Sequence, residues 1–288
     1  MSSGCRRARF IRHEHQLGEW MRARRAPDAR LAGLLDRELL GYQHLRAQFA
    51  SWLEPPRPQL TLMIDLDGRL DADGEALPDA WIGGLDARPT IVGFGETYAS
   101  IDLKLSPLGA YTLTGRPLSE LTGACVPLAE VFGAGGRELV LRIRESEDWD
   151  ARFDLVEAFL LARLYRSPPA PRPDPAVVWA WERLRVSHGG ARIEALAAEL
   201  GCSRRYLRDG FVRQVGLPPK TVARLMRFQH VRERLEQAPT RWSDVAHSAG
   251  YADQSHLNRE FRALAHTTPS EFVRRLIPEG GVIGDGSH

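Results

Sequence analysis

Apolar positions in the C-terminal part of the chain recur at the spacing of amphipathic helices, and the whole pattern occurs twice. A shift of 50 residues superposes three pairs of equivalent positions: Leu207 and Leu257, Phe211 and Phe261, and Pro219 and Pro269. Upstream of these pairs, residues 196–203 and 245–253 both read as a short helix that ends in a glycine turn. The pattern therefore predicts an internal duplication of a helix-turn-helix.

The second copy predicts a helix with one apolar and one polar face. Gly250 can adopt the left-handed conformation that ends the preceding helix, and Asp253 can cap the next helix. The apolar positions that face the core are Leu257, Phe261 and Leu264. The outward positions are Gln254, Ser255, Asn258, Arg259 and Arg262.

The polar face of this helix has the chemistry of a base reader. Gln and Asn can make paired hydrogen bonds with adenine, and Arg can do the same with guanine. The N-terminal half of a recognition helix is the part that enters the major groove. We therefore predict base contacts by four residues: Gln254, Ser255, Asn258 and Arg259. A helix that merely faces solvent could carry polar residues here too.

The first copy favours the reading function because it repeats the core geometry with different outward residues. Ser203 is the expected cap, and the core positions are Leu207, Phe211 and Val215. The outward positions predicted to contact bases are Arg204, Arg205 and Arg208. Asp209 lies beside them, and we expect its carboxylate to hold a neighbouring arginine rather than to accept from a cytosine amino group.

Between the copies, residues 220–237 predict a helix of about sixteen residues, which would be roughly 24 Å long. Such a spacer could set two recognition helices about one turn of duplex apart, ~34 Å. Basic residues on or near these helices are the predicted phosphate contacts: Lys220, Arg224, Arg227, Arg262 and Arg274.

The N-terminal part shows short apolar runs instead. We predict strands in residues 44–53, 58–68, 79–85, 90–95 and 98–105, which favour an antiparallel sandwich or a small barrel. Ser106 and Pro107 then predict the start of a helix.

Residues 148–165 predict a further helix with one apolar stripe, formed by Trp149, Phe153, Val156, Phe159, Leu160 and Leu164. We expect this stripe to pack on the sheet, and a seam between two copies of the chain is the alternative. Five aromatic residues are candidates for lining a pocket, although aromatic residues on strands more often belong to the core: Trp52, Trp81, Phe94, Tyr98 and Tyr111.

A proline-rich stretch separates the two parts. Residues 166–176 can form neither helix nor central strand, so we predict a linker between a β-rich domain, residues 1–165, and a helical domain, residues 177–277. The fold class is thus α+β. Residues 177–275 hold 17 Lys and Arg against 10 Asp and Glu, and the rest holds 22 against 27. This division is typical of a polyanion-binding module joined to a module that does not bind polyanions.

Other function classes find little support. His13 and His15 lack further ligands at metal spacing, so we expect no metal and no cofactor. We also expect no membrane span and no secretory signal, hence a cytoplasmic protein. An enzyme of DNA repair would need an activated thiol at Cys5 or Cys125, and neither has a neighbouring His or Cys in sequence.

Residues 250–272, GYADQSHLNREFRALAHTTPSEF, together with residues 211–235, closely resemble the DNA-binding domain of AraC/XylS-type transcriptional regulators. The resemblance covers residues 177–275 and implies a seven-helix module with two helix-turn-helix units that binds promoter DNA. It implies base contacts by the outward residues named above. The chain departs from the family pattern at His266, where glycine is common, and at Asp209 and Gly210, where basic residues are frequent.

The N-terminal part resembles the companion domain of some bacterial members more weakly, in residues 19–43 and 103–121. This resemblance implies a β-rich, cupin-like domain for sensing or dimerisation. We therefore predict a sequence-specific transcriptional regulator that acts in the cytoplasm. Its further expected partners are a small-molecule effector, RNA polymerase and a second copy of the chain. The alternatives are a DNA-targeted enzyme such as an alkylation-repair protein and a dimeric DNA-binding module without an effector.

Overall fold

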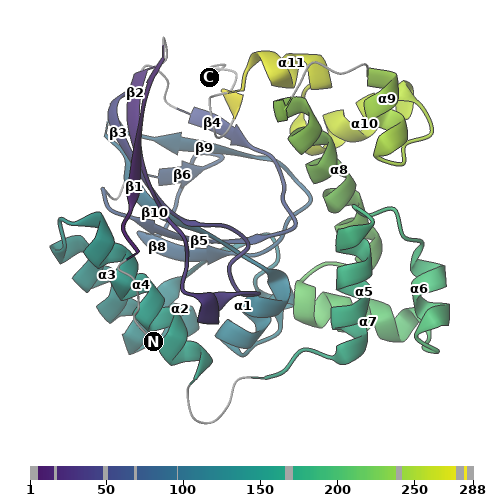
Figure 1. Ribbon diagram of the computed structural model, residues 1–288, viewed down its shortest axis with the longest axis horizontal. Helices are drawn as coiled ribbons and strands as arrows, with labels where there is room; N and C mark the ends of the chain where they lie inside the picture. Colours follow the sequence, from purple (N-terminus) through teal and green to yellow (C-terminus); the bar gives the residue numbers. More distant parts are fainter. Residues whose placement is uncertain are drawn as a thin grey trace.

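The computed structural model describes residues 6–15, 18–47, 51–67, 70–95, 97–165, 171–237, 242–276 and 282–283. Two antiparallel sheets with flanking helices form the N-terminal part, and the C-terminal part is helical until its last strand (Figure 1). The predicted α+β fold class, with a β-rich part before a helical part, is confirmed.

The larger sheet has seven strands in the order β1-β2-β3-β10-β5-β8-β11. Their bounds are β1 Arg9–His15, β2 Gly18–Arg25, β3 Leu39–Ala47, β10 Ala99–Leu105, β5 Leu60–Asp65, β8 Ala80–Gly83 and β11 Cys125–Pro127. The smaller sheet has five strands in the order β12-β4-β9-β6-β7. Their bounds are β12 Val282–Ile283, β4 Ser51–Glu54, β9 Thr90–Phe94, β6 Leu70–Ala72 and β7 Glu75–Ala76.

Two features of the sheets differ from the sequence prediction. Residues 44–53, read as one strand, contribute to two strands, β3 and β4, which lie in different sheets. Strands β1 and β2 were not predicted, because arginine and apolar residues alternate in them without a continuous apolar run. In β2 the arginines Arg22 and Arg25 are themselves buried, which hides the usual inward and outward alternation.

Helices cover one face of the larger sheet (Figure 1). The helical segments of this part are η1 Ala29–Leu31, α1 Pro107–Thr114, η2 Leu118–Glu120, α2 Leu128–Phe132, α3 Ala134–Glu145 and α4 Trp149–Leu164. Helix α1 begins as predicted, since the Ser106 hydroxyl accepts a hydrogen bond from the Gly109 amide and Pro107 occupies the first turn.

The apolar stripe of α4 packs on the sheet, as expected. Trp149, Phe153, Val156 and Leu160 are buried, and a side chain at Gly41 of β3 would collide with the Trp149 ring. Gly41 therefore lets the helix approach the sheet closely. The stripe is covered within one chain, so the alternative of a seam between two copies finds no support here.

A buried ion-pair network fastens the N-terminal strands to α4. Glu157, which is 4% exposed, accepts hydrogen bonds from Arg25 Nη2 at 2.9 Å and from Arg6 Nη1 at 2.9 Å. The amide of Asp28 donates to the same carboxylate at 2.6 Å. Arg25 is only 2% exposed, so its charge depends on these buried partners.

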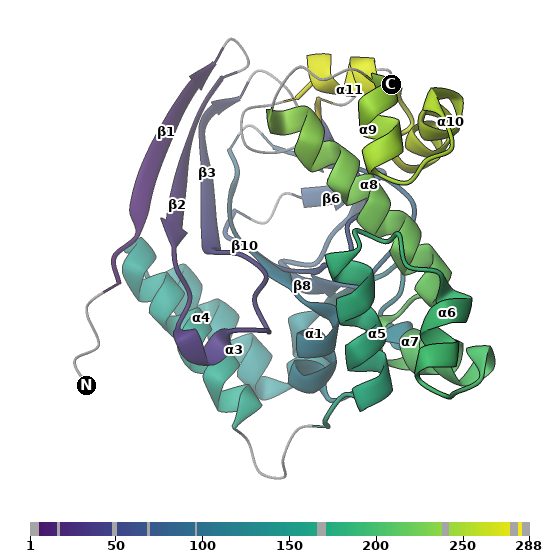
Figure 2. The same ribbon diagram turned by 45° about the vertical axis from the view of Figure 1, so that its right-hand side comes forward.

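The C-terminal part contains seven helices within its described residues. They are α5 Pro175–Val186, α6 Ile193–Glu199, α7 Arg204–Val215, α8 Pro219–Gln237, α9 Trp242–Ser248, α10 Gln254–Ala265 and α11 Pro269–Arg274. Helices α7 and α10 each have 12 residues and begin 50 positions apart, as the repeat predicts. We call α5 to α7 the first unit and α9 to α11 the second unit. Figure 2 shows α8 running between the two units.

The boundary between the two parts falls partly outside the described residues. Helix α4 ends at Leu164, residues 166–170 are not described, and α5 begins at Pro175 after the capping residue Asp174. The domain limits of 1–165, 166–176 and 177–277 therefore stay predictions.

Glu157→Ala should lower the free energy of unfolding by about 3–5 kcal/mol, because it removes the buried counter-charge of the buried Arg25 and leaves it only the more exposed carboxylates of Asp150 and Asp154. The check is chemical denaturation of the full chain followed by tryptophan fluorescence. Glu138→Ala on α3 is the control, since this exposed carboxylate is 3.9 Å from Arg142, and it should change the value by less than about 0.5 kcal/mol. Equal effects of the two substitutions would contradict the assignment.

Candidate nucleic-acid interface

Each recognition helix begins at a side-chain cap that the sequence predicts. The Ser203 hydroxyl accepts a hydrogen bond from the Tyr206 amide at 3.1 Å at the start of α7. The Asp253 carboxylate accepts from the His256 amide at 2.7 Å at the start of α10. Gly201 and Gly250 have positive φ in the turns before the two caps. In both units, a glycine with positive φ lies in the turn after one helix, and a side-chain cap begins the next helix.

The inner faces of both helices are fully buried. Leu207, Phe211 and Val215 of α7 are 0% exposed, as are Leu257, Phe261 and Leu264 of α10. Because these positions follow the three-and-four spacing of one helix face, the opposite face is left at the surface.

The predicted base readers lie on those outer faces. Arg204, Arg205 and Arg208 are exposed on α7, and Gln254, Ser255 and Arg259 are exposed on α10. Asn258 is half-buried. The structure thus gathers each set in the N-terminal part of its helix.

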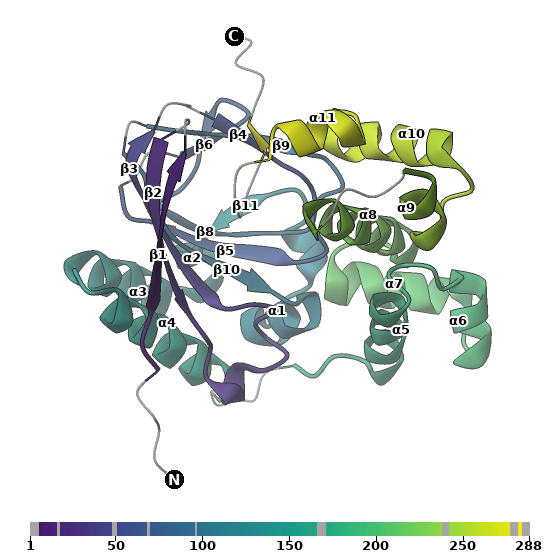
Figure 3. The ribbon, with the colours of Figure 1, turned by 45° about the horizontal axis from the view of Figure 1, so that its top comes forward.

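The two helices also share a direction. In Figures 1 and 3, α7 and α10 both begin at the side of the molecule away from the sheets and run toward the sheets. Helix α8 has 19 residues, three more than expected, and is about 28 Å long at the usual rise per residue. The N-terminal ends of α7 and α10 therefore lie on the same side of the molecule.

Carboxylates accompany the arginines of α7. Arg208 Nη2 lies 3.1 Å from one oxygen of Asp209, and Arg205 Nε lies 3.6 Å from the other. Arg204 Nη1 is 3.7 Å from Glu194 of α6. Asp209 thus holds its neighbouring arginines, as expected. Arg259 of α10 has no ion pair within the described residues, so the two reading faces differ in free positive charge.

The predicted phosphate contacts divide into two groups. Lys220, Arg262 and Arg274 are exposed. Arg224 and Arg227 are half-buried: Arg224 Nε donates to Glu260 at 2.5 Å, and Arg227 Nη1 donates to the Gly189 carbonyl at 2.7 Å. These two arginines hold α8 against its neighbours, and their role as phosphate contacts stays a prediction.

Tyr206 is a surface residue of α7 that the sequence reading missed. It is 50% exposed, and its hydroxyl donates a hydrogen bond of 2.5 Å to Asp174, the cap of α5. This bond, with further hydrogen bonds from backbone amides, lowers the pKa of Asp174 despite the opposing effect of burial. The sequence did offer a signal for Tyr206: it is an aromatic residue that does not lie on the apolar face of α7.

His266 ends α10 in the left-handed conformation, with φ of 50°. The departure from the family pattern noted at this position therefore coincides with a backbone conformation that favours glycine. A non-glycine residue there carries a conformational cost of about 1 kcal/mol.

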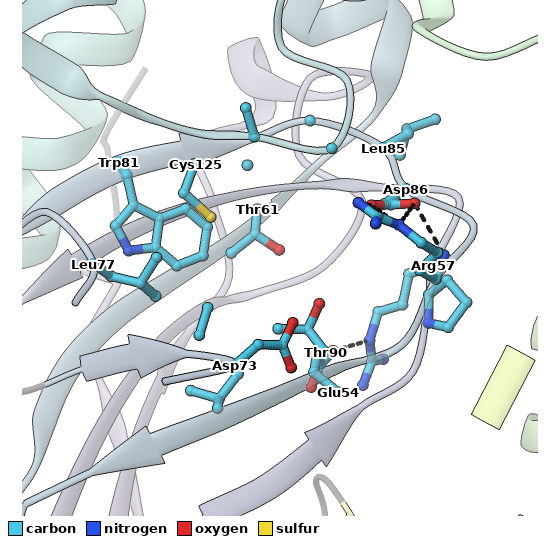
Figure 4. Close-up of a pocket in the computed structure, with 18 of the residues that line it drawn as sticks. Glu54, Arg57, Thr61, Asp73, Leu77, Trp81, Leu85, Asp86, Thr90 and Cys125 are labelled. Atoms are coloured by element: carbon cyan, nitrogen blue, oxygen red, sulfur yellow. Dashed lines mark hydrogen bonds and ion pairs between the residues drawn. The ribbon is translucent and has the colours of Figure 1, made fainter. Parts of the chain in front are cut away.

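A pocket of about 730 Å³ opens between the two sheets (Figure 4). Strands β4, β6, β7 and β9 of the smaller sheet and β5, β8 and β11 of the larger sheet contribute to its walls. Glu54 accepts a hydrogen bond of 2.6 Å from Arg57 at one side, and Asp86 pairs with Arg88 at 2.9 Å. Figure 4 shows the Asp73 carboxylate between the Trp81 ring and the Glu54–Arg57 pair.

Of the five aromatic pocket candidates, Trp81 lines this pocket. Trp52, Phe94 and Tyr98 pack on one another instead, with ring centroids 5.0–5.8 Å apart. Tyr111 of α1 packs against the core beneath the larger sheet. The plain core interpretation is therefore right for these four residues.

The alternative hypothesis of a DNA-repair enzyme requires a reactive thiol or a metal site. Burial raises the pKa of Cys125 to about 11, so little thiolate forms at neutral pH. Cys5 lies outside the described residues, as does the side chain of His15. The described part of the chain holds no group of three or more potential metal ligands, and none of its helices is long and apolar enough to cross a membrane.

Comparison with known proteins identifies the helical part. Residues 196–275 match the model of a helix-turn-helix domain family. No curated protein matches the chain in sequence.

Among solved structures, ToxT from Vibrio cholerae covers 81% of this chain and 96% of its own, with 13% identity and a TM-score of 0.47. The C-terminal domain of AraT, a response regulator from Geobacillus stearothermophilus, covers 41% of this chain and 98% of its own, with 22% identity and a TM-score of 0.35. The xylose-binding transcription activator XylR covers 44% and 39%, with 21% identity and a TM-score of 0.32. Similarities of this size carry no information about ligands of this chain.

Asp209→Asn should strengthen binding to random-sequence duplex, because it releases Arg205 and Arg208 from a carboxylate that also repels phosphates. Each additional phosphate contact should steepen the slope of log K against log salt concentration by about 0.9. Titration of the full chain with fluorescent duplex over a range of salt concentrations measures this slope. Glu182→Gln, which removes an exposed carboxylate paired with Arg185 on α5, is the control. An unchanged slope for Asp209→Asn would refute the expectation.

Proposed function

We propose that this chain is an AraC-type, DNA-binding transcriptional regulator and not an enzyme, and that it reads two successive major grooves of promoter DNA. The match of residues 196–275 to a helix-turn-helix domain supports the proposal. Helix α7 would read one half-site and α10 the other. One observation carries the proposal: two capped helices, related by a 50-residue repeat, each bury an apolar face, expose unlike polar residues and begin on the same side of the molecule.

The roles of individual residues follow from their chemistry. Arg204, Arg205, Arg208 and Arg259 would make paired hydrogen bonds with guanine, and Gln254 and Asn258 with adenine, with Ser255 as a further contact. Exposed Lys220, Arg262 and Arg274 would bind phosphates and set the register without reading sequence. Arg224 and Arg227 would first have to leave their present partners, so we place them second among the phosphate contacts.

We also infer a small-molecule effector site in the pocket between the sheets. The pocket has a size usual for ligand sites and combines the Trp81 ring with charged groups. Its carboxylates outnumber its guanidinium groups: Glu54, Asp73, Glu75 and Asp86 face Arg57 and Arg88. An excess of negative charge disfavours anions, so the expected ligand is neutral or cationic.

Further partners are proposed on function alone. A regulator of transcription acts beside RNA polymerase, and we place this protein in the cytoplasm, where promoter DNA lies. A homodimer would need a surface other than the α4 stripe, because that stripe is covered by the sheet. A DNA-binding module without an effector is the competing hypothesis for the N-terminal part.

Arg259→Ala should cost about 1–3 kcal/mol in binding to the preferred duplex and should relax base preference at one position. Selection from random duplexes by the wild-type chain, followed by titration of single-base variants, provides the measurement. Arg262→Ala on the same helix is the control: it should weaken all duplexes alike and reduce the salt slope by about one contact. Equal losses of Arg259→Ala on preferred and random duplexes would exclude base reading by this residue.

Asp73→Asn should abolish the response to cationic ligands and spare the response to neutral ones. The substitution removes one charge, and Asn can keep both the positive φ of this residue and its acceptance of the Ile91 amide. Thermal shift of the full chain against a panel of amines and neutral metabolites tests this, since binding to the folded state raises its melting temperature. Glu138→Gln, outside the pocket, should leave every shift unchanged. If the wild-type chain responds to no compound, the module without an effector is favoured.

A further inference from the structure

Strand β4 separates two compartments of the molecule. It has only four residues, and their side chains alternate between its two faces. Trp52 and Glu54 lie on the inner side: Trp52 packs on Phe94 with ring centroids 5.0 Å apart, and Glu54 lines the pocket. Leu53, between them, is 7% exposed and packs instead in the core of the second unit.

The C-terminal strand joins the second unit to β4. After α11 the chain returns as β12, whose Val282 pairs with Leu53 and whose Ile283 pairs with Trp52. Val282 is fully buried in the cluster that also contains Phe261 of α10 and Phe272 of α11. The Ile283 amide donates to the Arg275 carbonyl at 3.0 Å, which ties the strand back to the end of α11. Strand β12, which follows the second unit, is thereby hydrogen-bonded into the smaller sheet.

A charge cluster makes a second link between the pocket and this unit. Burial alone would raise the pKa of Glu54, but the positive charges of Arg57, Lys104 and Arg232 and the hydrogen bond from Arg57 lower it to about 2. Arg232 belongs to α8, is 3% exposed and lies with its guanidinium carbon 5.6 Å from the centre of the Phe272 ring. One pocket carboxylate is therefore coupled to a buried cation that contacts α11.

The first unit is held at a different place. The Thr122 hydroxyl, just after η2, donates to the Gly216 carbonyl at the end of α7 at 2.8 Å. Phe211 and Val215 share a core with Leu118 and Leu121 of that region. The N-terminal part thus contacts the end of α7 through the η2 region, whereas Leu53 of β4 packs in the apolar cluster formed by α8 and the second unit.

We propose that β4 couples the pocket to the second helix-turn-helix unit, and that its pairing with β12 is the physical link. This proposal rests on the proposed function. In the paired state α10 is held with its start on the same side as that of α7, which is the arrangement that reading two half-sites requires. A ligand that contacts Glu54 or Arg57 would shift β4. That shift would change the pairing of β4 with β12 and the packing of Leu53 in the cluster that contains α10. The coupling is a free energy shared by the two sites, so it acts in both directions.

The test is a double-mutant cycle on DNA affinity in the full chain. Val282→Asp places a charge in the apolar contact with Leu53, and Glu54→Gln removes the charge that faces Arg57 and Arg232. The ligand is a duplex selected by the wild-type chain, together with the same duplex carrying a scrambled second half-site. Val273→Asp, at an exposed valine on α11, and Glu138→Gln, at an exposed carboxylate on α3 outside the pocket, are the matched controls.

Val282→Asp should weaken binding to the two-half-site duplex by about tenfold and Glu54→Gln by about threefold, because the second reading event loses its preorganisation. The double variant should be no weaker than Val282→Asp alone, since both act through one link. All variants should bind the scrambled duplex alike. Losses that multiply in the double variant, or wild-type affinity of Val282→Asp, would overturn the proposal. Equal wild-type affinity for selected and random duplexes would refute the proposed function itself, and this coupling with it.

Hydrogen exchange of the full chain keeps the test decisive if Val282→Asp disturbs folding. Amides of residues 51–54 should exchange faster in Val282→Asp and in Ile283→Pro, which removes the amide that donates to Arg275 and restricts the backbone of β12. Amides of α7 and β10 should keep their protection, and Val273→Asp should match wild type throughout. If β4 exchanges at the wild-type rate in Ile283→Pro and that variant keeps full DNA affinity, β12 is not the link.

Discussion

Both recognition helices depend on the burial of one apolar face. A helix of 12 residues is marginal in water by itself, so α7 and α10 must gain their stability from contacts outside the helix. Three fully buried positions on each helix supply these contacts, at roughly 1.5–3 kcal/mol for each side chain. The same burial fixes the rotation of each helix about its axis. The direction of the outward residues is therefore a consequence of core packing.

Core packing also explains how much could be read from the sequence. The spacing of Leu207, Phe211 and their partners 50 residues later was enough to place α7 and α10, and Ser203 and Asp253 marked their first residues. The arginine-rich strands β1 and β2 were not predicted from the sequence. Arg25 of β2 is buried by its partners Asp150 and Glu157, which are far away in sequence. A two-residue strand such as β12 has no periodicity to detect, and the division of residues 44–53 between two sheets is set by tertiary contacts. Arg224 and Arg227 could be recognised as basic, but their partners Glu260 and Gly189 are brought near only by the fold.

The two units differ in charge although their scaffolds are alike. In the first unit, Asp209 and Glu194 accompany all three outward arginines of α7, and the Tyr206 hydroxyl donates to a further carboxylate, Asp174. In the second unit, the outward face of α10 combines an exposed arginine with amide and hydroxyl groups. Neutralised arginines contribute less to non-specific attraction by phosphates, while paired hydrogen bonds to bases are still available once the carboxylates are displaced. In the proposed function, the first unit would therefore depend more on matching its half-site, and the second unit more on general attraction.

The uneven charge along the chain connects DNA binding with the pocket. Residues 177–275 hold 17 basic against 10 acidic residues, whereas the rest holds 22 against 27. Duplex DNA is attracted to the first group and repelled by the second, so it should approach from the side on which α7 and α10 begin and not from the side of the sheets. The same acidic part places carboxylates around the pocket. The positive charges of Arg57 and Arg232 lower the pKa of one of them, Glu54. Charge therefore separates the two proposed ligands in space, and β4 is the element between the proposed effector site and the second helix-turn-helix unit.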